Sequence, residues 1–152
     1  MRFLIQRTRS VSVHIEGVPV AETSRPGMLI LVGITPEDTE ADIHYLVSKA
    51  LQLRIFDDEA GVMNRSVLEV GGEVTIVSQF TLLADTHKGN RPSYLRAARG
   101  EQAEPLYNKV VQTLQERLGK PVGTGRFGAD MQVSLVNDGP VTIWIDSQNR
   151  SY

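Results

Sequence analysis

The chain has 152 residues, enough to bury a sizeable core without metal or disulfide support, and its lack of cysteine excludes disulfides, thiol nucleophiles and cysteine-based zinc sites. Its formal net charge of -2 argues against wrapping a nucleic-acid duplex, so DNA is not an expected partner, although a local anion site is compatible with this charge. No apolar run approaches the roughly 18 residues of a membrane span, and the first residues turn polar too soon for a secretory signal, so we expect a cytoplasmic protein without membrane contact.

The N-terminal third is patterned as strands followed by a helix. Apolar residues recur at 2–7, 11–15 and 18–20, and this pattern predicts a meander of short strands. Residues 27–34 are almost wholly apolar, which is typical of a strand covered on both faces. A helix is expected to open at Thr35-Pro36. Its buried stripe is formed by Ile43, Leu46, Val47, Ala50 and Leu51.

Residues 73–82 predict a strand that ends in polar side chains. Alternation along this strand places Ser78 and Phe80 on one face and Gln79 and Thr81 on the other. We therefore expect Gln79 and Thr81 to line the same pocket.

The remaining elements complete a mixed pattern. They are short strands at 53–56, 131–137 and 141–146, a turn at 57–61, and a second long helix that follows Pro105 and stops at Gly119. No repeat, low-complexity tract or linker is present. The sequence therefore predicts one α+β domain over residues 1–152, with a barrel-like curved, mainly antiparallel sheet and two packed helices.

Several familiar site patterns are absent or misplaced. Residues 123–128 spell G-x-G-x-x-G, but they follow a helix terminator and lead into a strand, the reverse of a dinucleotide-binding fingerprint, so no cofactor is expected. The three histidines lack partners at organised spacing, and the acidic run at 57–59 lacks the ligand spacing of a calcium loop, so no metal site is expected.

Two short stretches carry most of the functional information. Ser78-Gln79-Phe80-Thr81 puts hydroxyl and amide groups at a strand end, where such groups either serve a site or satisfy backbone atoms. Gly139-Pro140 forms a corner that either presses bare backbone against a ligand or makes an ordinary tight turn between strands.

A basic segment lies between these stretches. Residues 86–99 contain Lys88, Arg91, Arg96 and Arg99 and no acidic residue, with Tyr94 available as a stacking ring. The segment is either a solvated face or a phosphate-binding site.

Four segments occur together in the order seen in one family. They are residues 78–81, 88–93, 124–131 and 137–142. On these segments the chain resembles D-aminoacyl-tRNA deacylase, from Met1 through Asp146, and only the tail at 147–152 lies outside the resemblance.

The resemblance implies an esterase that acts as a homodimer. Members of that family hydrolyse the ester between a D-amino acid and the terminal ribose of tRNA. By analogy, the Gly139-Pro140 bond is cis, and this corner enters the active site of the partner subunit. There its carbonyl oxygens accept hydrogen bonds from the substrate ammonium, and bare backbone fills the direction that an L side chain needs. A glycyl ester, which has no side chain to clash, is then expected to be cleaved as well.

The resemblance also implies roles for individual residues. In the catalytic segment from Ser78 to Thr81, the Gln79 side chain and the Phe80 N–H are donors for the developing oxyanion. Thr81 admits two roles: an attacking hydroxyl, for which no base is visible in the sequence, or a group that positions water while a ribose hydroxyl assists.

Three basic residues complete the expected site. Arg7 matches a family position that holds the Gly-Pro corner. The alternative interpretation is that Arg7 is an exposed strand arginine. Lys88 and Arg91 are candidates for binding the phosphates of the tRNA acceptor end.

Two other functions of the protein stay open. It could be a nucleic-acid-binding module without chemistry, or a hydrolase for other small acyl esters.

Overall fold

One long strand, β1 (Arg2–Ile15), organises the sheet in the computed structural model, which describes residues 1–151. It pairs antiparallel with β2 (Val18–Thr23), β3 (Gly27–Gly33) and β8 (Gln132–Asp146). β6 (Glu73–Ser78) then adds parallel to β3, and the short β7 (Gly123–Thr124) adds parallel to β6. The prediction of a mainly antiparallel sheet is confirmed, although one side of it is parallel.

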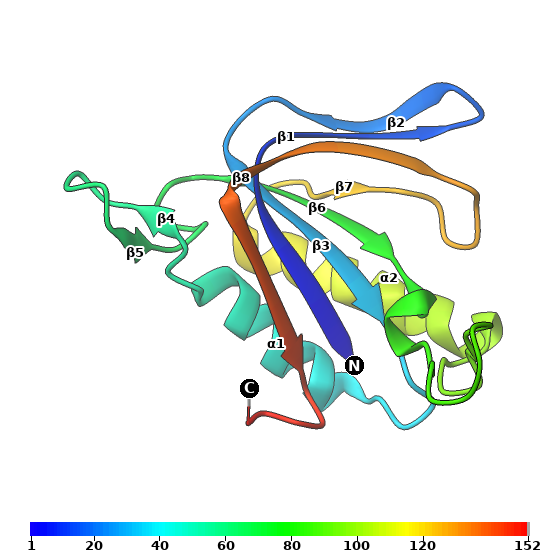
Figure 1. Ribbon diagram of the computed structural model, residues 1–152. Helices are drawn as coiled ribbons and strands as arrows, with labels where there is room; N and C mark the ends of the chain where they lie inside the picture. The colour runs from blue at the N-terminus through cyan, green and yellow to red at the C-terminus, as the bar shows by residue number, and fades with distance from the viewer. Residues whose placement is uncertain (152) are drawn as a thin grey trace.

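The six-stranded sheet curls into a nearly closed barrel. Its order is β2-β1-β3-β6-β7, with β8 branching from β1, and the two end strands β2 and β7 approach each other (Figure 1). A separate hairpin of β4 (Phe56–Asp57) and β5 (Met63–Arg65) projects from one end of the molecule (Figure 1).

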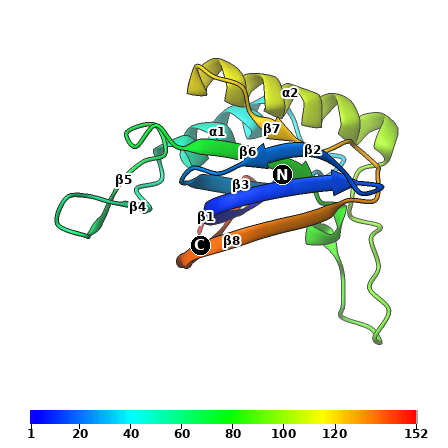
Figure 2. The same ribbon diagram turned by 90° about the horizontal axis from the view of Figure 1, so that it is seen from above.

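Both helices cover the same face of the sheet. α1 (Glu40–Gln52) and α2 (Gly100–Leu118) lie on one side, and β8 lies on the other (Figure 2). None of the helices in residues 1–151 has the length and apolar composition to cross a membrane. Two helices packed against one sheet confirm the predicted α+β class.

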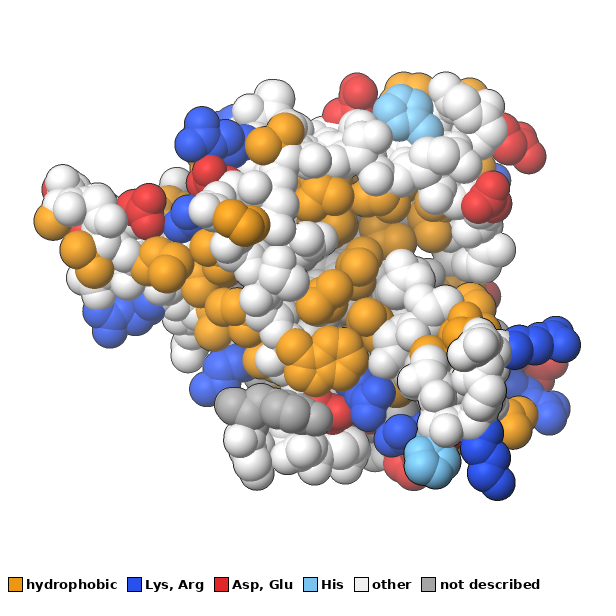
Figure 3. Space-filling model, viewed as in Figure 1, with side chains coloured by type: hydrophobic (Ala, Val, Ile, Leu, Met, Phe, Trp, Pro, Cys, Tyr) orange, Lys and Arg blue, Asp and Glu red, His pale blue; other side chains and the backbone are white. Residues whose placement is uncertain are grey.

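Alternation along β3 divides the core in two. Met28, Ile30 and Val32 belong to the main cluster beneath the helices, whereas Leu29 belongs to a second cluster on the other side of the sheet. The main cluster includes the fully buried residues Phe3, Ile5, Leu46, Ile76 and Leu114. Side chains on the face without helices stay only partly covered, and apolar groups line its hollow (Figure 3).

The helix starts differ from the predicted ones. α1 begins at Glu40, because Thr39 and Asp42 form a capping box, so the predicted opening at Thr35-Pro36 is wrong. α2 begins at Gly100, five residues before Pro105. Pro105 lies inside the helix, where a proline removes one backbone hydrogen bond and crowds the preceding turn, yet the helix runs through it.

The strand boundaries differ as well. β1 and β8 each run unbroken through segments that were expected to be separate strands, and the strand expected at 53–56 is reduced to Phe56–Asp57. Of the C-terminal tail at 147–152, Ser147 is buried and hydrogen bonded to Met1, and Tyr152 lies outside the described residues.

Candidate active site

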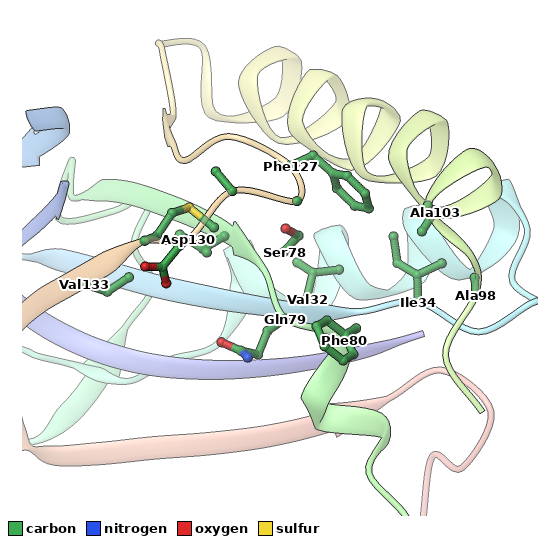
Figure 4. Close-up of a pocket in the computed structure, with 15 residues that line it drawn as sticks. Val32, Ile34, Ser78, Gln79, Phe80, Ala98, Ala103, Phe127, Asp130 and Val133 are labelled. Carbon is green, nitrogen blue, oxygen red and sulfur yellow. The ribbon is translucent and has the colours of Figure 1, made fainter. Parts of the chain in front are cut away.

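A pocket of about 500 Å³ lies where β3 and β6 end beneath the start of α2. Its walls are mainly apolar, and Ser78, Gln79 and Asp130 add polar groups (Figure 4). The lining residues are Val32, Ile34, Val77, Ser78, Gln79, Phe80, Ala98, Gly100, Ala103, Phe127, Gly128, Ala129, Asp130, Met131 and Val133. A concave, largely apolar site with a few polar groups is the usual form of a small-molecule site.

The chain turns sharply where β6 ends, and this turn builds one wall of the pocket. The Gln79 N–H donates to the Val32 carbonyl at 2.7 Å, which continues the pairing with β3 for one more residue. A short 3-10 helix, η1 (Phe80–Leu83), follows, with Leu83 fully buried beneath it. The predicted strand over 73–82 is therefore wrong from Gln79 onward.

Gln79 and Thr81 nevertheless lie together, for a reason other than strand alternation. The turn brings the Gln79 side-chain amide to the Thr81 hydroxyl, and its Nε2 donates a hydrogen bond to Thr81 Oγ1. Gln79 lines the pocket and Thr81 does not, so the expectation that both line it is wrong for Thr81. Phe80 is the first residue of η1, and the first amides of a helix have no partner within it, which makes the Phe80 N–H an available donor beside the pocket.

The opposite wall comes from the glycine-rich connection at 123–128. This connection leads from β7 toward β8, and Phe127 and Gly128 line the pocket together with Asp130 (Figure 4). Reasoning from the sequence rejected a dinucleotide motif here and assigned these residues no other role. The signal that could have found them is the run at 124–131, one of the four segments of the family resemblance.

Tyr107 supports both walls from behind. Its hydroxyl donates to the Ile76 carbonyl of β6 at 2.9 Å, and its ring packs against Phe127 with centroids 5.9 Å apart. Burial raises the pKa of the Tyr107 hydroxyl to about 12, so the group is a neutral donor at physiological pH. Tyr107 thus ties α2 to the strand that ends in Ser78.

The Gly139-Pro140 corner lies elsewhere, as a bulge within β8. β1 pairs Gln6 with Thr142 and Thr8 with Asn137, so only Arg7 lies opposite the intervening residues. The peptide bond before Pro140 is cis, as the resemblance implies, and both residues of the corner are exposed. The corner lines no part of its own chain's pocket and lies far along the sheet from η1 (Figure 1).

Arg7 supports this bulge from within the protein. It is only 7% exposed, and its Nε donates to the Asp138 carbonyl at 3.2 Å. Its Nη1 donates to the Ile55 carbonyl at 2.7 Å and to Asp57 at 3.1 Å. The interpretation of Arg7 as an exposed strand arginine is therefore wrong, because its guanidinium lies between the bulge and the β4 region.

Lys88 and Arg91 lie in the loop between η1 and α2. Backbone hydrogen bonds between Asp85 and Ser93 close this loop, which projects from the body of the molecule (Figure 2). Both cations are exposed and lie outside the pocket. The structure therefore brings Ser78, Gln79, Phe80 and Thr81 together, and it holds Lys88 and Arg91 apart from them.

The comparisons with known proteins agree in pointing to one family. A family model described as D-Tyr-tRNA(Tyr) deacylase matches residues 4–146. A protein of Chromobacterium violaceum named D-aminoacyl-tRNA deacylase is 58% identical over 98% of this chain and 99% of its own length. A protein of Bacteroides thetaiotaomicron with the same name is 55% identical over 99% of each chain.

Solved structures share the fold. One titled "c-Myc DNA Unwinding Element Binding Protein" has a TM-score of 0.89 at 40% identity, over 96% of this chain and 98% of that one. Another, titled as a probable eukaryotic D-amino acid tRNA deacylase, has a TM-score of 0.80 at 16% identity over 95% and 97%, a likeness of fold alone. With the family model covering most of its length and relatives more than half identical throughout, this chain belongs to the D-aminoacyl-tRNA deacylase family.

Proposed function

We propose that this protein hydrolyses the ester bond of D-aminoacyl-tRNA, releasing the free D-amino acid and tRNA. The observation that carries the proposal is the pocket at the end of β6, lined by Gln79 and Phe80 with Thr81 hydrogen bonded to Gln79, in a chain that is 58% identical to a named deacylase. The test is incubation of the purified protein with D-tyrosyl-tRNA and L-tyrosyl-tRNA. Release of tyrosine from the D ester alone is expected, and equal release from both would contradict the proposal.

Hydrolysis of the aminoacyl ester requires mainly that the reacting groups are positioned and that the developing negative charge is stabilised. An aminoacyl ester is already activated, so donors aimed at the developing oxyanion supply much of the catalysis. The Gln79 side chain and the Phe80 N–H are those donors. Ser78 lines the same pocket and completes the catalytic segment.

Thr81 acts in this scheme as a positioning group for water, assisted by a ribose hydroxyl of the tRNA. A threonine nucleophile needs a base to take its proton, and among the described residues that line the pocket only Asp130 is ionisable. The Thr81 oxygen already accepts a hydrogen bond from Gln79, which reduces its capacity to attack. Thr81→Ala is expected to slow turnover, with no covalent intermediate in the wild type. Trapping an aminoacyl ester on Thr81 would instead make it the nucleophile.

Selection of the D isomer is assigned to the main chain of Gly139 and Pro140 from a second copy of the chain. In its own chain this corner is exposed and lines no part of the pocket, so it is free to enter the pocket of a partner. A two-fold dimer gives both pockets the same insert. The carbonyl oxygens would hold the substrate ammonium, and the backbone would fill the space that an L side chain requires.

The uncovered face of the sheet supports assembly of two copies. Leu4, Leu31 and Trp144 are only partly buried there, although each lies between residues of the main core on its strand. Apolar side chains line the hollow of this face (Figure 3). Such a surface is typical of one that another molecule covers.

Mixed dimers test the shared pocket directly. Gln79→Ala disables the pocket of its own chain, and Gly139→Ala disables the insert that its chain donates. If inserts cross between subunits, a mixed dimer contains one intact pocket out of two. Random pairing makes about half of the dimers mixed, so refolding the two inactive variants together restores about a quarter of wild-type activity. Refolding each variant alone is the control. No recovery despite proven mixed dimers would place pocket and insert in the same chain.

Exclusion by clash also predicts activity on an ester without a side chain. Glycyl-tRNA is expected to be cleaved, because it has nothing to collide with the Gly139-Pro140 backbone. The idea fails if the enzyme leaves glycyl-tRNA intact while cleaving D-tyrosyl-tRNA.

A second candidate is nucleic-acid binding without chemistry through the basic loop. One structural relative at 40% identity is titled as a DNA-binding protein, which favours keeping this candidate. Tight binding of uncharged tRNA or DNA with no ester cleavage would support it. A third candidate, hydrolysis of other small acyl esters, requires activity on free D-amino-acid esters equal to that on charged tRNA.

A further inference from the structure

An exposed aromatic pair stands at the rim of the pocket. The rings of Phe80 and Tyr94 meet edge to face, with centroids 5.0 Å apart and planes at 79°. Phe80 is 56% exposed and also lines the pocket, and Tyr94 is 39% exposed beside it. An edge-to-face contact braces each ring while leaving part of its surface free.

Backbone hydrogen bonds fix the position of Tyr94. Asp85 and Ser93 exchange backbone hydrogen bonds of 2.8 and 2.9 Å, which close the loop immediately before Tyr94. After it, the Ala97 N–H donates to the Tyr94 carbonyl at 3.0 Å, and the Ala98 N–H donates to Ile34 at 2.8 Å. Tyr94 is thus anchored on both sides, although the loop itself projects from the molecule.

The chain segment around Tyr94 is rich in cations, although Asp85, which pairs with Ser93, is an acid beside it. Residues 86–99 contain two cations before Tyr94 and two after it, Lys88, Arg91, Arg96 and Arg99, with no acidic residue among them. All four are exposed. Exposed aromatic rings among cations are typical of surfaces that bind single-stranded nucleic acid, where bases stack on rings and cations follow the phosphates.

We propose that Tyr94, braced by Phe80, stacks on the base of the nucleotide next to the terminal adenosine of the tRNA. The inference rests on the proposed deacylase function, in which the ester and its ribose occupy the pocket. The preceding nucleotide then leaves the pocket through its mouth, past Phe80, which lines the pocket, and Tyr94, which contacts Phe80. Stacking tolerates any base, so this contact positions the acceptor end without reading its sequence.

Substrates of increasing length separate this contact from the pocket itself. Tyr94→Ala, Tyr94→Phe and the control Leu95→Ala are assayed on D-tyrosyl-adenosine, on the D-tyrosyl ester of cytidylyl-adenosine, and on D-tyrosyl-tRNA. Leu95 is 93% exposed in the same loop but has no ring, so its truncation controls for loss of apolar surface. Tyr94→Phe keeps the ring and loses only the hydroxyl.

The expected pattern depends on the second nucleotide. Tyr94→Ala raises KM about 5- to 100-fold for the dinucleotide ester and for the tRNA, leaves KM for D-tyrosyl-adenosine unchanged, and leaves kcat within about twofold throughout. Tyr94→Phe and Leu95→Ala behave as wild type.

Four results would overturn the inference. Equal rises in KM for all three substrates would make Tyr94 a support of the pocket, and unchanged KM for all three would show that nothing stacks on it. A Tyr94→Ala protein that no longer sediments as the wild type does would assign the ring to the contact between copies. A wild type that cleaves none of the three esters refutes the deacylase proposal, and this inference with it.

Discussion

The turn after β6 and the bulge of β8 are both irregular backbone at strand positions, but they are built in opposite ways. The turn at Ser78–Thr81 is tied to β3, seated on the buried Leu83 and enclosed in a pocket with apolar walls. The bulge at Gly139-Pro140 is exposed, and the buried Arg7 contacts it from the side of β4. The turn is complete within one chain, whereas the bulge presents its polar backbone outward.

This difference indicates where each region finds its partner. The turn is held in shape by contacts within its own chain, so it needs no second molecule to form. Outward-facing backbone that its own chain braces but does not cover is suited to contact another molecule. Removing the brace, removing the contact and loosening the pocket should therefore have separable effects.

The largest effect is expected from Gly139→Ala. The φ angle of Gly139 is +121°, and an added Cβ would lie 2.8 Å from Val141 Cγ2 and 3.2 Å from Arg7 Nη2. The bulge must then shift, and a displacement of about 1 Å in a positioning group costs on the order of 100-fold in rate. We expect kcat/KM on D-tyrosyl-tRNA to fall by about 100-fold.

Gly17→Ala is the matched control for this change. Gly17 has a φ of +77°, so alanine is strained there too, but no atom lies within 4 Å of the added Cβ. Its activity should stay within about twofold of wild type, because backbone strain in a distant turn does not move the site. If Gly139→Ala also keeps wild-type activity, the bulge does not take part in the reaction.

Arg7→Ala tests whether the Arg7 side chain holds the Gly139-Pro140 bulge in place. It leaves the carbonyls of Ile55 and Asp138 without their buried donor, and each such loss costs about 1–3 kcal/mol. We expect the free energy of unfolding in urea to fall by about 2–6 kcal/mol, with activity lost at temperatures where the variant is still folded.

Arg9→Ala removes a second arginine from the same Asp138. The Arg9 side chain is 72% exposed, and ion pairs in solvent contribute little to stability. Its melting temperature and activity should stay near those of wild type. Equal effects of the two substitutions would mean that the charge on Asp138 matters and the buried brace does not.

The sequence located both regions but could not give their construction. Phe80 and Leu82 keep the alternation of a strand, so nothing local showed that η1 would begin after Gln79 and bury Leu83 instead. Pro140 predicted a break between strands, whereas β1 pairs with β8 on both sides of it. The contact of Arg7 with Asp138 spans 131 positions in the sequence, and no local pattern reports such a pair.

A smaller effect is expected from the double variant Lys88→Ala/Arg91→Ala. These cations lie outside the pocket, so their removal should weaken binding of tRNA while sparing kcat. Each phosphate contact to a single strand contributes about 0.7 to the slope of log affinity against log salt. The slope should become shallower by about 1.4, measured as KM between low and physiological salt.

The double variant Lys49→Ala/Arg117→Ala removes the same charge from the exposed surfaces of α1 and α2. Its salt dependence should match the wild type, because only the loop is expected to touch phosphate. If both double variants reduce the slope of log affinity against log salt equally, the tRNA responds to the overall electrostatic field of the protein and not to a defined contact with the loop. A steep salt dependence of the wild type would indicate many phosphate contacts, and therefore a contact that extends beyond the acceptor end.

The smallest effect at neutral pH, and the most specific in pH, is expected for Tyr107→Phe behind the pocket. Loss of the hydrogen bond to Ile76 should lower the free energy of unfolding by about 1 kcal/mol. In the wild type, burial raises the pKa of Tyr107 from 10.0 to about 12. The folded state therefore favours the neutral hydroxyl, a contribution that is complete below pH 10 and is lost as the pH rises toward 12, by about 2–3 kcal/mol.

Phenylalanine has no proton to lose, so the variant escapes this alkaline loss. The stability curves of the wild type and of Tyr107→Phe, measured by urea denaturation from pH 8 to pH 12, should cross in the upper part of that range. Parallel curves would mean that the pKa of Tyr107 is not raised, and therefore that its hydroxyl reaches water.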